Sequence, residues 1–449
     1  MIRDIHKIAL INPDNPINKA NPELSEMFER NSKHVKQWAA PALSLLTIAA
    51  LIPESIEVEY IDERYEEIDF DKNYDLVGLT SMTHQVVRAY KIAKIFKEKG
   101  IPVVMGGIHA SILPEEALQH VDTVFVGESE NLWPKYLNDF KHFKEKRLYE
   151  NKDVIELTQS PVPRYELIKH DLFKNMDNYF NFIPVQATRG CPHDCSFCVA
   201  TKYYGKRIRK KEVDQVVKEI EHLRKFNQES LIFFADDNLF VDKKYVKSLL
   251  HALIPLKLKY FAQTDVKFAD DEELLELAYL SGFEMVFIGF ESINLESLDE
   301  INKNKWKMNQ SKNYSSAIKK IQAHGIVPFG GFIIGFHHDT LNTFKAISEF
   351  VVQNNFPAAF TLLTPLPGSR LRDELQSEGR LFEMGSWDKC GFYSLLFKHD
   401  SMSKIDAEKA LVKLYEDVYT TENALQRAFH MKKMYKNLPK RWSYKPVSP

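Results

Sequence analysis

The sequence predicts an α/β protein in which a doubly wound Rossmann-like domain is followed by a partial (β/α)6 barrel and a helical C-terminal region. Two observations predict this fold class. Short apolar runs alternate with amphipathic helical segments over residues 1–145, and the same alternation returns six times over residues 181–375. Residues 146–180 lack a clear period and are expected to be a linker, and residues 376–449 make up the helical region.

The expected elements of the first domain are short and closely spaced. Apolar runs predict strands, and segments with apolar residues on one face predict helices. The strands cover residues 8–11, 56–61, 76–79, 103–105 and 124–126, and the helices cover residues 42–52 and 84–99. In such parallel sheets ligands bind at the carboxyl ends of the strands.

The second unit repeats the pattern. Its six expected strands cover residues 183–188, 231–234, 260–264, 285–290, 326–334 and 360–363. The active site of a barrel lies at the carboxyl ends of its strands. The helical segment 405–434 is expected to cover the open side of the barrel and to shape the substrate pocket.

The loop after the first barrel strand carries three of the four cysteines of the chain, Cys191, Cys195 and Cys198. Thiolates suit iron–sulfur clusters, and a cubane normally takes four of them, so three would leave one iron open to a small chelating molecule. Zinc held with His193 is an alternative, but zinc ligands usually come from two separated places. A disulfide would leave an odd cysteine and needs an oxidising compartment.

The Cys-x3-Cys-x2-Cys spacing, with the aromatic Phe197 before the third cysteine, resembles that of the radical S-adenosylmethionine (SAM) enzymes. The resemblance implies a [4Fe-4S] cluster on the three cysteines. It also implies that SAM chelates the open iron and is split to a 5′-deoxyadenosyl radical.

The same resemblance assigns SAM contacts to the barrel strand ends. These are Phe197, Asp236, Asp237, Gln263, Glu291, Ser292, Gly331 and Ile333. The two aspartates would bind the amino group of SAM, because a carboxylate matches a cation. The following polar residues would reach the ribose and the methionine carboxylate, and the Gly-x-Ile-x-Gly strand would lie along the adenine. Alternatives remain: Asp237 as a helix N-cap, Glu291 as a buried paired acid and Gly331 as a bulge.

The loops of the first domain together resemble the cobalamin-binding domain that precedes many radical SAM domains. The order Gly-Gly-Ile-His-Ala, Leu-Pro-Glu-Glu-Ala and Val-Gly-Glu-Ser-Glu carries this resemblance. It implies cobalamin contacts from Ser81, Thr83, Gly106, Gly107, His109, Gly127 and Glu128. Plain turn chemistry is the alternative for the glycines, and a loop polar residue is the alternative for His109. The first loop, residues 12–17, lacks the Asp-x-His-x-x-Gly motif whose histidine ligates cobalt in related domains.

The resemblance predicts a cobalamin-dependent methyltransferase that acts on an unactivated carbon. The alternative is a radical SAM cyclase, oxidase or carbon–carbon coupling enzyme in which cobalamin is absent or non-methylating. A methylthiotransferase is disfavoured because no cysteine precedes Cys191, and a non-catalytic sensor is disfavoured by the full set of strand-end residues. The expected partners are a small-molecule, lipid or tetrapyrrole-like substrate and an electron donor such as flavodoxin or ferredoxin.

Composition limits the partners and the cellular compartment that the protein is expected to have. A net charge of −2 gives no general case for nucleic-acid binding, and no apolar run is long enough to span a bilayer. Low cysteine usage and the lack of a secretory signal at Met1 favour the cytoplasm.

Cys390 is expected to be an inert packed thiol. The basic tail, residues 432–445, could touch a membrane surface or be a solvated terminus, and Arg207 and Arg209 are candidates for the SAM carboxylate or for a solvated face.

Overall fold

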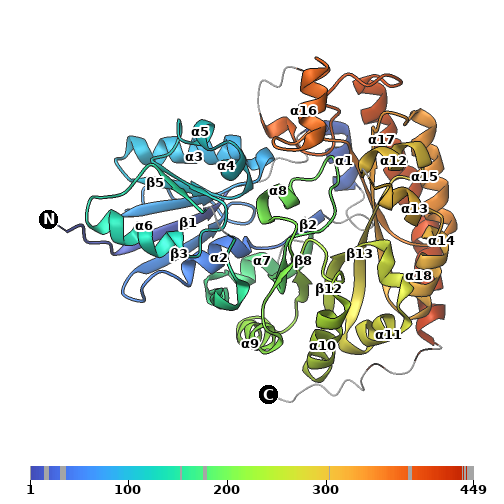
Figure 1. Ribbon diagram of the computed structural model, residues 1–449, viewed down its shortest axis with the longest axis horizontal. Coiled ribbons are helices and arrows are strands. Elements are labelled where there is room, and N and C mark those ends of the chain that lie inside the picture. Colours follow the sequence, from blue (N-terminus) through green and yellow to red (C-terminus); the bar gives the residue numbers. More distant parts are fainter. Residues whose placement is uncertain are drawn as a thin grey trace.

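The computed structural model describes residues 2–14, 20–30, 37–151, 154–174, 179–302, 304–382, 387–436, 438 and 441. Two α/β units lie side by side, with the N-terminal unit on the left of Figure 1 and the barrel unit on the right. The predicted fold class is confirmed. Half of the basic tail, including Trp442 and Tyr444, lies outside the described residues.

The first unit is a six-stranded, all-parallel sheet with the order β3-β1-β4-β5-β6-β7. Its strands are β1 Lys7–Asn12, β3 Glu57–Asp62, β4 Leu76–Thr80, β5 Val103–Gly106, β6 Thr123–Val126 and β7 Leu148–Glu150. Apolar residues of α3 (Val86–Glu98), α4 (Ile108–Ile112) and α5 (Pro114–Ala117) pack on one face. Those of α2 (Leu43–Ala49) and α6 (Leu132–Lys141) pack on the other. The chain changes direction across the sheet between β1 and β4, which is where a doubly wound sheet binds its ligand.

The second unit is a seven-stranded parallel sheet with the order β15-β14-β13-β12-β11-β8-β2. Its strands are β2 Gln37–Ala39, β8 Tyr179–Val185, β11 Leu231–Phe234, β12 Tyr260–Thr264, β13 Phe283–Glu291, β14 Val327–Ile334 and β15 Ala358–Leu362. Helices α9 (Val213–Arg224), α10 (Lys243–Leu253), α11 (Glu272–Ser281), α14 (Tyr314–Ala323) and α15 (Leu341–Gln353) alternate with the strands and cover the outside. The six predicted barrel strands are present, and their carboxyl ends share one mouth.

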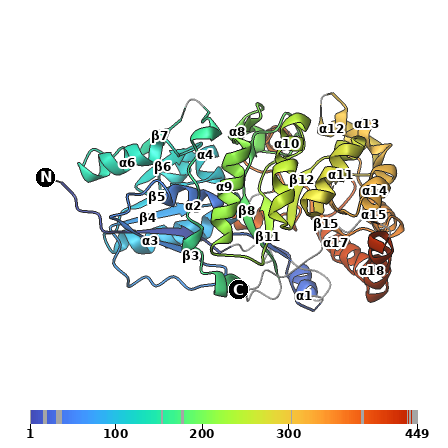
Figure 2. The ribbon, with the colours of Figure 1, turned by 90° about the horizontal axis from the view of Figure 1, so that it is seen from below.

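The sequence did not predict that the chain visits the barrel unit before the first unit is complete. Helix α1 (Pro22–Arg30) leaves the first sheet after β1 and packs on α17 (Lys404–Val418), where the Phe28 ring lies 5.0 Å from that of Tyr415. Figure 2 shows α1 on the barrel side of the molecule. Strand β2 then pairs with β8 in the second sheet. A contiguous first domain over residues 1–145 therefore does not describe the chain's path.

Two further elements differ from the expected boundaries. The expected linker begins with β7, which pairs with β6 and so extends the first sheet beyond residue 145. The predicted strand at 183–188 is β8, which ends at Val185, and the chain then forms β9 (Thr188–Arg189). Strand β9 pairs antiparallel with β10 (Arg209–Lys210), and this short ribbon brackets the cysteine loop.

The C-terminal region closes the exposed edge of the barrel sheet. It forms two helices, α17 and α18 (Thr421–Lys436), in place of one continuous segment. The Tyr415 hydroxyl accepts the Phe360 N–H and donates to the Phe360 carbonyl, and Tyr419 bonds Ala358 in the same way. These hydroxyls satisfy backbone groups that edge strand β15 would otherwise expose. None of the helices in the described part of the chain has the length and apolarity needed to cross a bilayer.

Candidate active site

The three motif cysteines lie in the loop that leaves β9 at the mouth of the barrel. Their side chains are partly buried, and two of the sulfurs accept hydrogen bonds: Cys195 Sγ from Asn302 Nδ2 and Cys198 Sγ from the Ala200 N–H, both at 3.4 Å. Burial raises the pKa of Cys191 to about 11 and that of Cys198 to about 12, and the neighbouring thiols add to both increases. Three clustered thiols that resist ionisation without a cation suit an iron–sulfur cluster, and N–H donors to sulfur are a usual feature of such sites.

The zinc alternative is not supported by the contacts of His193. Its Nε2 lies 3.2 Å from Asp265 Oδ2, and its ring packs on Trp306 at 4.1 Å. His193 therefore supports the loop through Asp265 and Trp306.

The two aspartates after β11 have different surroundings. Asp236 is fully buried and accepts the backbone N–H groups of Ala187 and Thr188, so it anchors the entry to the cysteine loop. Burial raises the pKa of Asp236 to about 7. Burial also raises the pKa of Asp237, whose Oδ2 is buried without a hydrogen-bond partner among the described residues. An acceptor in this state beside the cysteines fits the ammonium group of SAM.

The polar residues at the ends of β12 and β13 are held by other protein groups. Gln263 donates to the Asp236 carbonyl at 3.4 Å, and Ser292 Oγ accepts the Asn294 N–H at 3.1 Å. Glu291 Oε1 lies 2.9 Å from Lys307 Nζ, which also donates to the Gly289 carbonyl. The structure therefore gives Glu291 a buried partner, as the alternative interpretation expected.

Aromatic rings fill the inner face of the barrel sheet below these polar groups. The Phe233 ring stacks on that of Phe261 at 5.2 Å, and the Phe287 ring stacks on that of Phe329 at 5.9 Å. A Cβ at Gly331 would collide with the Phe287 ring, so the missing side chain makes room for Phe287. Ile333 is half-buried on the same strand, and Phe197 contacts Phe336 edge-to-face at 6.0 Å. These rings make the inner face of the sheet apolar beneath the cysteine loop.

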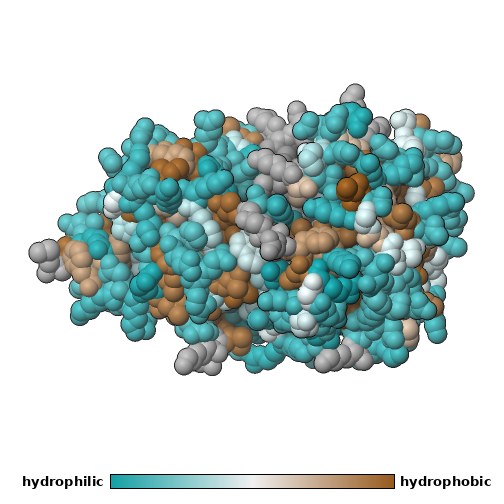
Figure 3. Space-filling model, turned by 90° about the horizontal axis from the view of Figure 1, so that it is seen from above, coloured by the Kyte–Doolittle hydropathy of each residue, from teal (hydrophilic) through white to brown (hydrophobic). Residues whose placement is uncertain are grey.

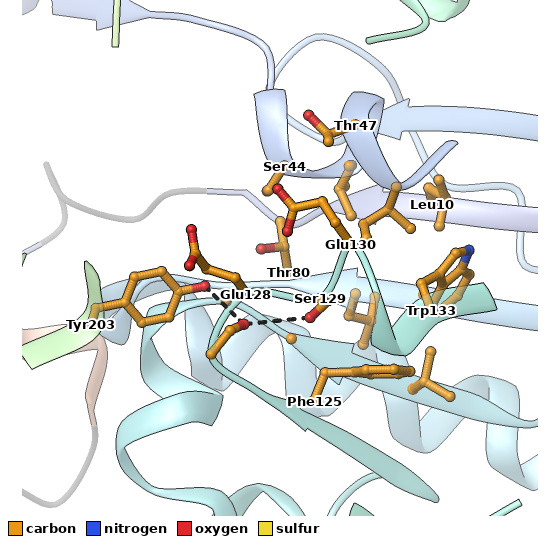
Figure 4. A pocket seen from close by; sticks show the side chains of 18 of the residues that line it. Leu10, Ser44, Thr47, Thr80, Phe125, Glu128, Ser129, Glu130, Trp133 and Tyr203 are labelled. Atoms are coloured by element: carbon orange, nitrogen blue, oxygen red, sulfur yellow. Dashed lines mark hydrogen bonds between the residues drawn. The ribbon is translucent and has the colours of Figure 1, made fainter. Parts of the chain in front are cut away.

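A cavity of about 100 Å³ lies at the carboxyl edge of the first sheet, between α2 and α6 of the first unit and α8 (Ala200–Tyr204) of the barrel unit. Figure 4 shows the side chains that line it. The walls are apolar where Leu10, Phe125 and Trp133 meet, and polar where hydroxyls and carboxylates face inward. Gly106, Gly107, Gly127 and Glu128 line the cavity, as predicted for cobalamin contacts, whereas Ser81, Thr83 and His109 do not.

Gly107 and His109 are fixed by separate constraints. Gly107 has φ +95°, and a Cβ there would lie 2.9 Å from the Ser81 backbone, so only glycine fits. His109 is fully buried with Nε2 3.2 Å from Glu116 Oε1, and Trp387 Nε1 donates to the same carboxylate at 2.9 Å. Burial lowers the pKa of His109. His109 thus joins the C-terminal segment to the first unit.

Glu128 contacts two arginines of the barrel unit. Its Oε1 lies 2.6 Å from Arg189 Nη1, and its Oε2 lies 2.6 Å from Arg209 Nη1. Arg209 is therefore occupied by Glu128, and Arg207 is exposed and paired with Glu156. Sequence reasoning missed this network and Lys307, because the partners of each pair lie on separate elements of the chain.

Comparison with known proteins identifies the family. A model of the radical SAM superfamily matches residues 185–351, and a model of the B12 binding domain matches residues 39–136. The bacteriochlorophyllide d C-12(1)-methyltransferase of Chlorobaculum tepidum is 33% identical over 395 residues, which make up 86% of this chain and 84% of that protein. This chain belongs to the cobalamin-binding radical SAM family.

A second relative and a solved structure are also similar to this chain. The bacteriochlorophyllide d C-8(2)-methyltransferase of the same organism is 30% identical over 407 residues, 88% of this chain and 89% of that protein. The solved structure of the radical S-adenosylmethionine methyltransferase TsrM from Kitasatospora setae, with cobalamin and a [4Fe-4S] cluster bound, has the same fold. Its TM-score is 0.69 at 14% identity, over 96% of this chain and 99% of that one.

The predicted reaction class and cofactors are confirmed. The protein is a cobalamin-dependent radical SAM methyltransferase, and its cofactors are a [4Fe-4S] cluster, SAM and cobalamin. The cysteine loop suits the cluster, and Asp237 Oδ2 suits the ammonium group of SAM. The cavity of the first unit lies at the sheet edge where a doubly wound domain binds its ligand. The individual residue assignments remain predictions.

Proposed function

We propose that this methyltransferase transfers a methyl group to a carbon of a tetrapyrrole-like macrocycle. The observation that carries the proposal is the similarity to two bacteriochlorophyllide d methyltransferases over 84% and 89% of their lengths. A large planar substrate needs an apolar approach to the barrel mouth. Figure 3 shows several apolar patches, separated by hydrophilic side chains, on the face seen from above.

Exposed apolar side chains support the same substrate class. Met82, in the loop after β4, is 47% exposed, and Phe382, after α16 (Arg370–Ser377), is 41% exposed. Met82 lies next to η2 (Thr83–Gln85), on which η7 (Trp387–Lys389) of the C-terminal region packs. Solvent-exposed apolar groups favour a ligand with a wide apolar face.

The protein's own residues position and shield the reacting groups. When bound, the cofactors supply the adenosyl radical and the methyl group. Asp237 would accept hydrogen bonds from the SAM ammonium, and Asp236 holds the backbone that carries the cysteine loop. The aromatic rings on the inner face of the sheet give the barrel interior an apolar lining, which would disfavour water near a radical once the cofactors are bound.

The cluster also needs one electron at a time from a partner. The expected donor is a small acidic carrier of the flavodoxin or ferredoxin type. His193 lies between two cluster cysteines and packs on the partly exposed Trp306, and Lys267 lies over the Trp306 ring at 5.7 Å. An aromatic group beside a cation next to the cluster suits the docking of an acidic partner.

The test uses anaerobically reconstituted enzyme with SAM, a low-potential reductant and candidate substrates. Bacteriochlorophyllide and a hopanoid represent the planar and the non-planar classes. We expect a mass increase of one methyl group in the tetrapyrrole, with S-adenosylhomocysteine and 5′-deoxyadenosine formed in equal amounts. Methylation of the hopanoid without methylation of the tetrapyrrole would overturn the substrate class. Formation of 5′-deoxyadenosine without S-adenosylhomocysteine would favour cyclisation or coupling.

A further inference from the structure

Two segments far apart in the sequence meet in a buried ionic cluster. One is the loop after β6, which contains Glu128 and Glu130, and the other is the pair of short strands β9 and β10, which contain Arg189 and Arg209. Arg189 Nη1 lies 2.6 Å from a carboxylate oxygen of each glutamate, and Arg209 Nη1 lies 2.6 Å from Glu128. We call these four residues the interdomain ion cluster.

The interdomain ion cluster is electrically balanced and almost dry. The side chain of Arg209 is 1% exposed and that of Glu128 is 6% exposed. Backbone groups complete it: the Ile155 N–H donates to Glu128 Oε2 at 3.2 Å, and Arg209 donates to the Ile155 carbonyl at 2.7 Å. Removing one member of a buried, hydrogen-bonded ion pair leaves an uncompensated charge, so the arrangement is strongly held.

The interdomain ion cluster holds both ends of the cysteine loop. Arg189 precedes Cys191 by two positions, and Arg209 pairs with Arg189 across the β9–β10 ribbon. The cysteine loop runs between these two strands. Glu128 therefore fixes, from the first unit, the two points at which the loop enters and leaves the barrel unit.

Three of these four residues form a wall of the cavity in the first unit. Glu128, Glu130 and Arg189 line it together with Tyr203 and Tyr204 of α8. The Tyr203 hydroxyl donates to the Gly127 carbonyl at 3.3 Å, as Figure 4 shows. A ligand that fills this cavity thus packs against the loop that holds Arg189.

We infer that Glu128 is a positioning residue that couples cobalamin binding in the first unit to assembly of the iron–sulfur cluster on the cysteine loop. Cobalamin in the cavity holds residues 127–130 in place, and these residues in turn hold Arg189 and Arg209 at the two ends of the cysteine loop. An iron–sulfur cluster assembled on the cysteines holds the cysteine loop from the other side. Coupling between two binding sites is reciprocal, so each cofactor strengthens the binding of the other by the same factor. The inference does not depend on the substrate class.

The test compares the affinity for hydroxocobalamin, measured anaerobically by absorption titration, in protein with and without the cluster. Replacement of Cys191, Cys195 and Cys198 by alanine gives the cluster-free form. We expect the wild-type protein to bind cobalamin roughly tenfold more tightly when the cluster is present, within the usual range of coupling between sites. In Glu128→Gln this ratio falls toward one, whereas Glu156→Gln, which breaks the exposed pair with Arg207, keeps the wild-type ratio.

Folding of the variants is checked by far-UV circular dichroism and by iron content. If Glu128→Gln does not fold, Glu130→Gln is used in its place, because it removes the charge of one of the two carboxylates on Arg189. The ratio of cobalamin affinities with and without the cluster is then measured in that variant. A partial loss of the ratio in Glu130→Gln supports the coupling. A wild-type ratio of one, or a variant of Glu128 or Glu130 that folds and keeps the full ratio, overturns it.

Discussion

Lys307 Nζ lies 2.9 Å from Glu291 Oε1 in the interior of the barrel, next to the cysteine loop. Although burial opposes the charge of the lysine, the Glu291 carboxylate and then the nearby Cys195 thiol raise its pKa. Lys307 in turn lowers the pKa of Cys195 against the larger effect of burial. Glu291 has φ +66°, a strained conformation for a non-glycine residue, and Lys307 is among the contacts that hold it there.

Replacing Lys307 by methionine should destabilise the fold by about 3–5 kcal/mol, because Glu291 would stay buried without its partner. Chemical denaturation of the cluster-free protein measures this change. The matched control is Lys305→Met, which breaks an exposed pair with Asp299 and should cost less than about 1 kcal/mol. The double variant Lys307→Met with Glu291→Gln should recover part of the loss. An equal loss of stability in Lys307→Met and Lys305→Met would contradict a buried ion pair between Lys307 and Glu291.

Asp237→Asn should weaken SAM binding by roughly 10- to 100-fold while the cluster content stays unchanged. The physical reason is the loss of a charged acceptor for the SAM ammonium, and hydrogen bonds to charged groups contribute about 1.5–3 kcal/mol. Equilibrium dialysis with labelled SAM gives the affinity, and iron analysis gives the cluster content. The exposed Asp270→Asn serves as control. Unchanged SAM affinity in Asp237→Asn would remove Asp237 from the SAM site.

The stability of the cluster-free protein should fall between about pH 4 and pH 7 through Asp236. Burial raises the pKa of this carboxyl from 3.8 to about 7, so the folded state binds more protons than the unfolded state within that window. Stability then decreases as the pH rises and levels off above pH 7. In Asp236→Asn this component of the pH dependence should vanish from melting curves. A variant whose pH profile parallels the wild type would contradict the assignment.

Gly107→Ala should reduce both stability and cobalamin retention, because the added Cβ meets the Ser81 backbone at a positive φ. We expect a loss of about 1–3 kcal/mol. Gly100→Ala is the matched control, since Gly100 also has a positive φ but nothing lies within 4 Å of an added Cβ. Gly100→Ala should lose about 1 kcal/mol of stability, which measures the backbone strain alone, and its cobalamin retention should stay normal. Normal retention in Gly107→Ala would show that this loop is not needed for cobalamin.

Trp306→Ala should slow reduction of the cluster by flavodoxin at least about fivefold, because tryptophan is enriched among the interface residues whose truncation costs more than about 1 kcal/mol. Reduction by dithionite should not change, which separates docking from damage to the cluster. Stopped-flow absorption follows both reactions, and Phe226→Ala removes an exposed aromatic elsewhere as a control. Equal slowing with both reductants would point to an altered cluster.

The sequence predicted the parts of this structure that depend on local pattern. The cysteine loop is defined by eight adjacent residues, and the buried strands are defined by apolar runs such as 76–79. It could not predict β2, because three residues carry no period and their pairing with β8 is long-range. The partners of Glu128 and Glu291 were missed for the same reason, since the arginines and lysine that neutralise them lie on other elements.

The most direct test of the account is the absorption spectrum, with the iron and cobalt content, of protein reconstituted without oxygen in the presence of iron, sulfide and cobalamin. The account predicts broad iron–sulfur absorption with about four iron atoms and about one tightly held cobalamin per chain. A full cluster without retained cobalamin would contradict cobalamin-dependent methyl transfer by this protein.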